Sequence, residues 1–168
     1  MVVPNSEQLA IQSITYRALI DTEIAKLCAI DRSETRDGHF ICVAGRLAYV
    51  AHPWSHPGFS PEEVNHWVSR LCDLQAHGGM VIGALLNTTP VGIAAVHRQA
   101  RGPRGDRRRL EFLHVSRPYR GQGIGTRLLL LAQQAAWAMG ARQLYITGSP
   151  TPRTVEFYLR QGCRLTAE

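Results

Sequence analysis

Lysine is almost absent from this sequence of 168 residues: Lys26 is the only one, so nearly all of the 19 basic residues are arginines. The sequence also lacks any run of about 18 apolar residues, which argues against a membrane-spanning helix. Its first residues contain no basic segment followed by an apolar one, so no secretory signal peptide is expected. The cysteines lie far apart without a CxxC pair, which excludes a zinc ribbon or a disulfide scaffold. We therefore expect a reduced, cytoplasmic protein without a metal and without membrane contact.

The sequence does carry excess positive charge, with a formal net charge of +6. Arginine side chains suit the recognition of phosphate and carboxylate groups, so a polyanionic ligand is one interpretation. Composition alone leaves nucleic acid and an anionic cofactor open as that ligand. A solvated basic surface without any ligand is the third interpretation.

The length and the hydrophobic fraction of 45% are those of one globular domain, which we assign to residues 1–168. Periodicity and capping signals predict strands and helices in mixed order, with antiparallel strands first and a strand–helix–strand–helix unit last. This order favours a mixed α/β (α+β) single domain. The predicted strands are 14–19, 80–86, 90–97, 110–115 and 143–147, and the predicted helices are 22–30, 61–74, 124–139 and 152–161.

Two segments have patterns too weak for a confident assignment of regular structure. Glycines and prolines interrupt residues 31–59, where only a short strand at 46–51 is indicated, so we expect a loop beside the substrate. Residues 101–109 are rich in arginine and glycine but contain no aromatic residue. A solvated loop is therefore the favoured interpretation there, and nucleic acid is not expected as a partner.

The most informative segment is a glycine-rich turn between the strand at 110–115 and the following helix. Gly121, Gly123 and Gly125 leave room for backbone amides to approach a ligand closely. The first amides of a helix lack intrahelical partners and lie at the positive end of its dipole, which suits a phosphate group. The spacing is neither that of a P-loop nor that of a dinucleotide-binding turn. Close packing of strand on helix, without a ligand, is the alternative.

This turn resembles a known motif. The stretch 120–125 (RGQGIG) is similar to the Q/R-x-x-G-x-G/A acyl-CoA motif of the GNAT N-acetyltransferase superfamily, and its lead-in 113–119 is also similar. Near the end of the chain, 155–163 resembles the FYxxxGF stretch of that family. The resemblance extends over about 80–165. It implies a GNAT-like central sheet, mixed and mostly antiparallel, flanked by helices and splayed open at the cofactor-binding strand.

The resemblance also implies a function and roles for individual residues. The expected reaction is transfer of an acetyl group from acetyl-CoA to a primary amine, carried by a small molecule or a peptide, by direct attack in a ternary complex. Tyr158 is expected to protonate the leaving thiolate, and Glu111 to act as the base, with His114 as the alternative. No single base at all is a further possibility. The expected cofactor-binding residues are Leu113, His114, Val115, Arg120, Gly121, Gln122, Gly123, Ile124, Gly125, Thr126 and Arg153.

Two departures from the family pattern leave alternatives open. Arg153 stands where relatives often have asparagine, which questions one contact to the pantetheine arm. The sequence stops at Glu168, where relatives continue with a final strand or hairpin, so this element is expected to be missing and a homodimer becomes a candidate assembly. The alternative functions are a non-catalytic acyl-CoA-binding regulatory module and an acetyltransferase that acts on an RNA-bound amine.

Overall fold

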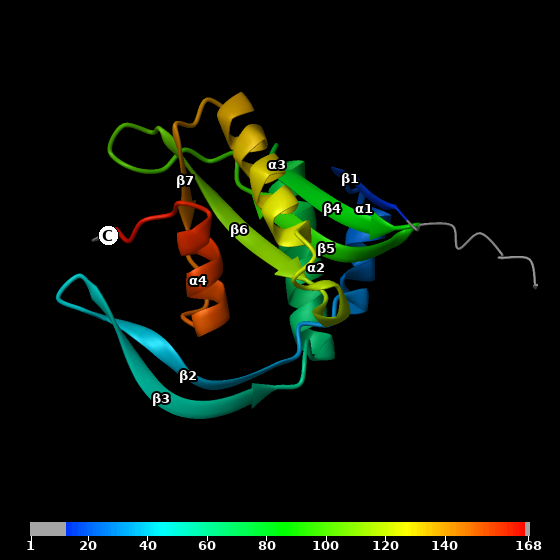
Figure 1. Ribbon diagram of the computed structural model, residues 1–168. Helices are drawn as coiled ribbons and strands as arrows, with labels where there is room; N and C mark the ends of the chain where they lie inside the picture. Colours follow the sequence, from blue (N-terminus) through cyan, green and yellow to red (C-terminus); the bar gives the residue numbers. More distant parts are fainter. Residues whose placement is uncertain (1–12, 167–168) are drawn as a thin grey trace, which may run out of the picture.

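A five-stranded sheet forms the centre of the computed structural model, which describes residues 13–166 (Figure 1). Its strand order is β1-β4-β5-β6-β7; all neighbours are antiparallel except β6 and β7, which are parallel. The mixed, mostly antiparallel sheet flanked by helices confirms the predicted fold class. The sheet strands are β1 (Ile14–Ala18), β4 (Met80–Leu86), β5 (Thr89–Val96), β6 (Arg107–Val115) and β7 (Gln143–Ile146). The helices are α1 (Asp21–Ile24), η1 (Ala25–Ala29), α2 (Pro61–Ala76), η2 (Arg117–Tyr119), α3 (Ile124–Ala138) and α4 (Pro152–Arg160).

Two hydrophobic clusters cover the two faces of the sheet. On one face, α3 buries Leu128, Leu129 and Ala132 against strands β4 to β6. On the other face, α1, η1 and α2 bury a second cluster that includes Leu27 and Leu71. Each face removes its apolar side chains from water, which accounts for the three-layer arrangement.

The predicted N-terminal cap is confirmed at α2 but not at α1. At α2, Ser60 followed by Glu63 three residues later is a sequence pattern that predicts a capping box, and the structure confirms it. Glu63 N–H donates to Ser60 Oγ at 3.2 Å, and Ser60 N–H donates to Glu63 Oε2 at 2.9 Å. At α1, Asp21 is of a residue type that favours N-caps, and the sequence predicts it as the cap of the helix at 22–30. This prediction is wrong, because the helix begins at Asp21 and Ile20 occupies the cap position. Glu23 satisfies the Ile20 N–H instead, at 3.2 Å.

The expected loop at residues 31–59 is wrong over most of its length. It forms a long antiparallel hairpin, β2 (Glu34–Val43) and β3 (Arg46–His56), which is a separate two-stranded sheet. Figure 1 shows the hairpin standing apart from the central sheet, below α4. Neither hydrophobic cluster contains a residue of the hairpin. Without one buried face, the hairpin has no strict alternation of polar and apolar residues, and the sequence signal is correspondingly weak.

Strand β6 starts three residues earlier than predicted and contains a bulge. Arg107 and Arg109 belong to the strand, not to the preceding loop. The pairing with β5 shifts between Ala95–Phe112 and Val96–Leu110, so Glu111 is the extra residue. The bulge breaks the alternation of side chains along the strand. Strict alternation along the strand predicts that Glu111 shares a face with Leu113 and Val115. This prediction is wrong: Glu111 contacts α2, whereas Leu113 and Val115 pack on the α3 side.

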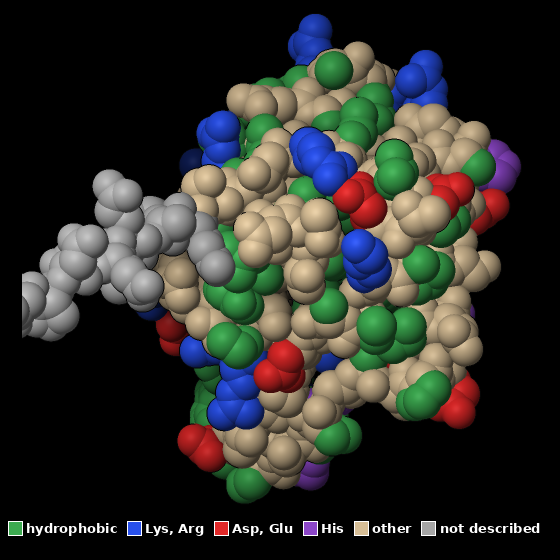
Figure 2. All heavy atoms as spheres, turned by 90° about the vertical axis from the view of Figure 1, so that its right-hand side faces the viewer, with side chains coloured by type: hydrophobic (Ala, Val, Ile, Leu, Met, Phe, Trp, Pro, Cys, Tyr) green, Lys and Arg blue, Asp and Glu red, His purple; other side chains and the backbone are tan. Residues whose placement is uncertain are grey.

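The basic residues are distributed over the surface. On the face drawn in Figure 2, blue side chains lie apart from one another among acidic and apolar ones. The single lysine, Lys26, lies on η1, and its Nζ donates to the Thr88 carbonyl at 3.3 Å. Between residues 13 and 166, no helix combines the length and the apolar character needed to cross a membrane.

Candidate active site

The central sheet opens where β6 and β7 separate. Pairing between these strands extends only from Arg107–Gln143 to Leu110–Ile146. Beyond Leu110, the remaining residues of β6 have no neighbouring strand on that side. The expected splay at the cofactor strand is thus present.

The exposed edge of β6 offers unpaired backbone groups to this gap. Ser116 N–H donates to Val91 O at 2.8 Å, which fixes the side on which β6 bonds to β5. Because bonding directions alternate along an antiparallel strand, the N–H groups of Leu113 and Val115 point the other way, into the gap. An extended ligand can therefore pair with this edge as an added strand would.

The glycine-rich turn lies at the end of the same edge. Gly121 and Gly123 have φ angles of +78° and +81°, and Gly123 is the N-cap residue of α3. Residues other than glycine adopt such angles at a cost, which explains glycine at both positions. A Cβ atom at either position would have no neighbour within 4 Å, so the space beside the turn is open. The amides of the first turn of α3 face a volume large enough for a ligand, as a phosphate site requires.

Arg120 joins this turn to the residues before the hairpin. Its Nε donates to Val115 O at 2.9 Å, its Nη1 to Ser33 O at 3.2 Å and its Nη2 to Asp31 O at 3.3 Å. Burial and the positive charge of Arg153 lower the pKa of Arg120. The side chain thus serves mainly as a strut that holds the turn in place, with its charge close to the amides of α3.

A cleft of about 980 Å³ runs from the glycine-rich turn through the gap to the α2 side of the sheet. It brings together every residue that was expected in the site except Gln122 and Ile124. The Ile124 side chain is in the core, 3% exposed, and Gln122 is exposed and bonds Pro118 O at 3.3 Å. These two residues can contribute only their backbone amides. The expected residues that line the cleft are Glu111, Leu113, His114, Val115, Arg120, Gly121, Gly123, Gly125, Thr126, Arg153 and Tyr158.

Tyr158 reaches the cleft from α4, the helix beside the gap. Its ring packs against Phe157, with ring centroids 5.1 Å apart, and a Cβ at Gly148 would approach it to 3.1 Å. Burial raises the pKa of the Tyr158 phenol, and the Cys163 thiol nearby adds to the rise. The hydroxyl is therefore protonated at neutral pH and available as a proton donor.

Glu111 is held in a cluster of basic side chains. Arg70 Nε donates to its Oε1 at 2.6 Å, while His97 Nε2 and Arg109 Nε lie 3.1 and 3.0 Å from its Oε2. The Glu111 side chain is 1% exposed. Burial by itself would raise the pKa of this carboxyl, but the Arg70 hydrogen bond and the charges of Arg109, Arg70 and His97 outweigh it and lower the pKa. A carboxylate stabilised in this way is a weak base.

His114 lies among aromatic rings on the α2 side of the sheet. Its ring centroid is 4.5 Å from that of Phe112 and 6.0 Å from that of Phe59. Burial, together with the charges of Arg32, Arg120 and His56, lowers its pKa to about 3. The imidazole is neutral over the physiological range, and its low basicity limits it as a proton acceptor.

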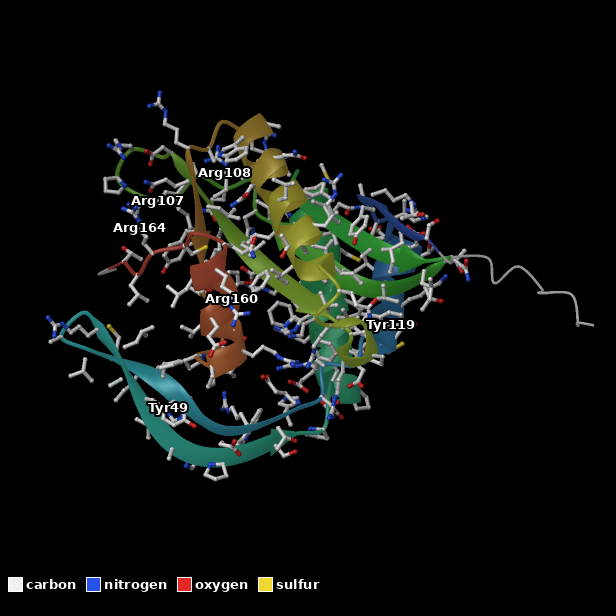
Figure 3. The ribbon with its side chains drawn as sticks, in the orientation of Figure 1. Tyr49, Arg107, Arg108, Tyr119, Arg160 and Arg164 are labelled. Atoms are coloured by element: carbon white, nitrogen blue, oxygen red, sulfur yellow. The ribbon has the colours of Figure 1, made fainter. Side chains whose placement is uncertain are left out.

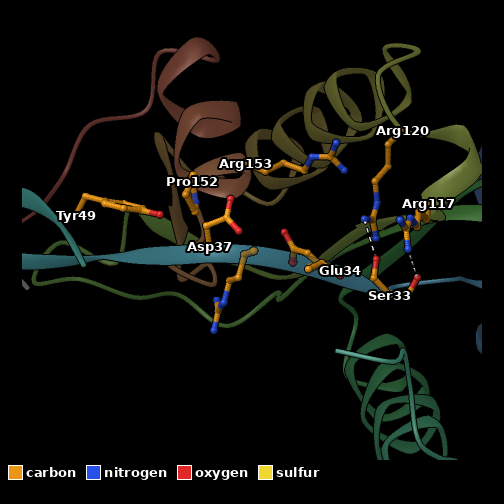
Figure 4. A pocket seen from close by; sticks show the side chains of 10 residues that line it. Ser33, Glu34, Asp37, Tyr49, Arg117, Arg120, Pro152 and Arg153 are labelled. Carbon is orange, nitrogen blue, oxygen red and sulfur yellow. Dashed lines mark hydrogen bonds between the residues drawn. The ribbon is translucent and has the colours of Figure 1, made fainter. Parts of the chain in front are cut away.

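A smaller pocket of about 340 Å³ adjoins the cleft between the hairpin, η2 and the start of α4 (Figure 4). Arg117 Nη1 donates to Ser33 Oγ at 3.3 Å across its floor. Arg117, Arg120 and Arg153 line it together with the carboxylates of Glu34 and Asp37. Arg153 thus lies at the junction of the pocket and the cleft, since it lines both.

Sequence reasoning did not single out several residues on the α2 side of the cleft, although it expected residues 31–59, Trp54 among them, to lie beside the substrate. Arg109 was assigned to a solvated loop, because a run of three arginines hides the start of a strand. Arg32, Arg36, Trp54 and Trp67 come from the hairpin region and α2, and only the folded chain brings them to β6. Residues 13–166 contain no group of three or more His, Cys, Asp or Glu side chains able to hold a metal ion.

Comparison with known proteins identifies one matching family. The model of the acetyltransferase (GNAT) family matches residues 46–163, which is more than half of the chain. Among curated proteins, no significant match is found.

Solved structures of acetyltransferases share the fold. Nourseothricin acetyltransferase is similar with a TM-score of 0.66 and 21% identity, over 88% of this chain and 81% of that one. A putative streptothricin acetyltransferase from Bacillus anthracis str. Ames, in complex with acetyl coenzyme A, is similar with a TM-score of 0.63 and 18% identity, over 90% of this chain and 82% of that one. Glucosamine-6-phosphate N-acetyltransferase from Arabidopsis thaliana is similar with a TM-score of 0.59 and 14% identity, over 93% of this chain and 95% of that one.

Proposed function

The chain belongs to the acetyltransferase (GNAT) family and is an acetyl-CoA-dependent acyltransferase, and from this premise we propose that it transfers the acetyl group to a primary amine. The amine attacks the thioester directly while both substrates are bound. The proposal rests on one observation: the glycine-rich turn, the unpaired edge of β6 and the Tyr158 phenol all line the same cleft.

In this proposal the glycine-rich turn and β6 hold the acyl donor. The amides at the start of α3 bind the pyrophosphate, with Thr126 behind them and the charge of Arg120 and Arg153 nearby. The edge of β6 binds the pantetheine arm through the backbone groups of Leu113 and Val115. The donor, when bound, supplies an acetyl group activated as a thioester.

The chain contributes positioning, one hydrogen bond to the carbonyl and a proton. The N–H of Val115 is unpaired on the gap side and donates to the thioester oxygen, where negative charge develops. The amine nitrogen forms a bond to the carbonyl carbon as the carbon–sulfur bond breaks. Tyr158 gives its hydroxyl proton to the departing sulfur and the amine loses one proton to solvent, so that an amide and a free thiol result; Tyr158 then regains a proton from solvent.

For Glu111 we propose a positioning role, because Arg70 donates to its Oε1 while His97 and Arg109 lie close to its Oε2. With a weakly basic Glu111 and His114, the amine enters the cleft in its neutral form. The charge of Glu111 then acts by orienting Arg70 and Arg109 on the α2 side of the cleft, where we place the acceptor amine.

The experiment that tests the proposal measures thiol release from acetyl-CoA over a panel of amines, with calorimetry of acetyl-CoA binding alongside. The panel contains amino acids, polyamines, aminoglycosides and peptides with free N-termini. Thiol release that depends on an amine, with the acetylated amine identified by mass spectrometry, supports the proposal. Tight binding of acetyl-CoA without transfer to any of these amines contradicts it and favours a regulatory module.

A further inference from the structure

Arg109 lines the cleft on its α2 side and has hydrogen-bond donors that the chain leaves without a partner. Its Nε is buried and lies 3.0 Å from Glu111 Oε2, yet it is not aligned for a hydrogen bond. Its Nη2 makes only a long contact, 3.4 Å, to Thr147 Oγ1. Within residues 13–166 the guanidinium makes no other hydrogen bond. Since buried donors are nearly always paired, this arginine lacks an acceptor that a ligand can supply.

The charge of Arg109 is also incompletely balanced. Glu111 is the only carboxylate within ion-pair distance of it among the described residues, and Arg70 approaches the same carboxylate through both Nε and Nη2, at 2.6 Å each. Two guanidinium groups thus share one carboxylate, with His97 Nε2 also at 3.1 Å. The cluster carries a net positive charge, which favours an anion beside it.

A second arginine with the same character comes from the hairpin. Arg36 lines the cleft and stacks on Trp54, with its guanidinium carbon 4.3 Å from the ring centroid. Its Nε is likewise buried without a hydrogen-bond partner. An aromatic ring leaves the charge of the guanidinium in place, so Arg36 adds a positive charge to the hairpin wall of the cleft, which also carries the Glu34 carboxylate.

The location of Arg109 suits contact with the acceptor. It precedes by one residue the last β6–β7 pair, Leu110–Ile146, and Thr147 is the first residue after β7. Leu113, the nearer of the two residues whose N–H groups point into the gap, is four residues along β6, at most about 13 Å away between Cα atoms. The guanidinium lies beside Glu111 Oε2 and Thr147 Oγ1, where β6 and β7 separate, so the group that Arg109 holds lies at the end of the gap.

We propose that the acceptor is an amine that carries an acidic group, a carboxylate or a phosphate, within a few bonds of the nitrogen, and that Arg109 binds this group. Thr147 Oγ1 is the second donor of the site. The inference rests on the proposed transfer to an amine and adds the class of amine. A planar guanidinium binds either acid through two parallel hydrogen bonds.

The first test needs only the unmodified protein and pairs of acceptors that differ in the acidic group. L-Alanine is compared with L-alaninamide, and phosphoethanolamine with ethanolamine, by thiol release from acetyl-CoA. We expect kcat/KM to be at least tenfold higher for the acidic member of one pair, and the pair that shows it distinguishes carboxylate from phosphate. Equal values in both pairs, or a preference for the neutral members, overturn the inference while amine acetylation itself stands.

The second test changes the arginine. Arg109→Met should lower the ratio of kcat/KM between the acidic and the neutral acceptor toward one, and Arg109→Lys should restore part of it. Arg104→Met is the matched control, because Arg104 is exposed on the loop before β6 and pairs with Asp106; it should leave the ratio unchanged. An unchanged ratio in folded Arg109→Met contradicts the inference. Thr147→Val, a smaller change at the same site, gives the same readout if Arg109→Met does not fold.

A third measurement separates this inference from the function on which it rests. If none of the amines releases thiol, binding of the same four acceptors is measured by calorimetry in the presence of CoA. Tighter binding of an acidic member supports the acid site although the transfer proposal has failed. Equal or undetectable binding of both members overturns the acid site.

Discussion

At the scale of single residues, the cleft separates a proton donor from two weak bases. Tyr158 is buried enough for its phenol to remain protonated, whereas Glu111 and His114 both have lowered pKa values. The chemistry of the proposed reaction therefore depends more on giving a proton to sulfur than on taking one from nitrogen.

Tyr158→Phe tests the proton donor. The change removes one hydroxyl while the ring keeps its packing on Phe157, so kcat should fall by about 10²-fold or more. The dissociation constant for acetyl-CoA, measured by calorimetry, should change little. Because the pKa of Tyr158 is raised, the alkaline loss of activity in the wild type should lie above about pH 10. Equal losses of turnover and of acetyl-CoA affinity would assign Tyr158 a structural role.

Glu111→Gln tests the carboxylate as an electrostatic centre. The variant leaves the partly exposed Arg70 and Arg109 without their shared charge, so the free energy of unfolding at pH 7 should drop by about 1–3 kcal/mol. The folded-state pKa of Glu111 is below its ordinary value, so its stabilisation is complete above that value, near 4.5, and is lost as the pH falls through the folded-state pKa. Urea unfolding at pH 7 and pH 3 should therefore show a smaller difference between wild type and variant at pH 3. A difference independent of pH would contradict the assignment.

At the scale of elements, the strengths of the sequence signals follow the packing of each segment. The capping box at Ser60 and the glycines at 121–125 act locally, so α2 and the start of α3 could be predicted from neighbouring residues. The hairpin β2–β3 and the bulge at Glu111 could not. The hairpin has no face buried in the core, and the bulge exists only because β5 pairs with β6 in a shifted register.

Gly123→Ala tests the turn before α3, and Gly140→Ala is its matched control. Both glycines have φ angles above +80° and open space around them, so each alanine should cost about 1–2 kcal/mol of stability. Gly140 follows α3 and does not line the cleft. Calorimetry should thus show weaker acetyl-CoA binding in Gly123→Ala alone. Equal affinities in both variants would remove the turn from the donor site.

Removal of the hairpin tests its independence from the core. Glu34 and His56 are partners in the β2–β3 register, so a short glycine linker can replace residues 34–56 without moving the ends apart. Because neither hydrophobic cluster includes these residues, the melting temperature should fall by only about 2–4 °C. The KM for the acceptor should rise, since Arg36 and Trp54 leave the cleft. Loss of cooperative unfolding would show that the hairpin supports the fold.

At the scale of the whole molecule, the positive charge divides into groups with different partners. Arg120 and Arg153 lie by the donor site, and Arg109 and Arg70 surround Glu111. Arg108 is buried, and its Nη2 donates to Met139 O at 2.6 Å. In Figure 3, Arg107 and Arg108 lie at the start of β6, far from Tyr49 of the hairpin. Arg160 on α4 lies between these arginines and Tyr49. The net charge alone gave no information on this division, because it depends on the fold.

This division predicts weak binding of nucleic acid. Charges committed to internal partners are not available to neutralise many phosphates at once, so binding should show a shallow dependence on salt. We expect fluorescence anisotropy with a structured RNA to give dissociation constants no tighter than the non-specific range, about 10⁻⁶ M, at 150 mM salt. Tight binding that falls steeply with salt would instead favour an acceptor amine attached to RNA.

The position of Lys26 has a chemical consequence for an enzyme of this kind. Lys26 carries the only side-chain amine of the sequence and lies outside the cleft, and its Nζ donates a hydrogen bond to the Thr88 carbonyl. Arginine side chains do not accept acetyl groups from a thioester at neutral pH, since they stay protonated. The protein therefore offers a single side-chain amine to its own activated substrate, and, apart from the α-amino group, Lys26 is the one amine that amine-reactive fluorophores can label.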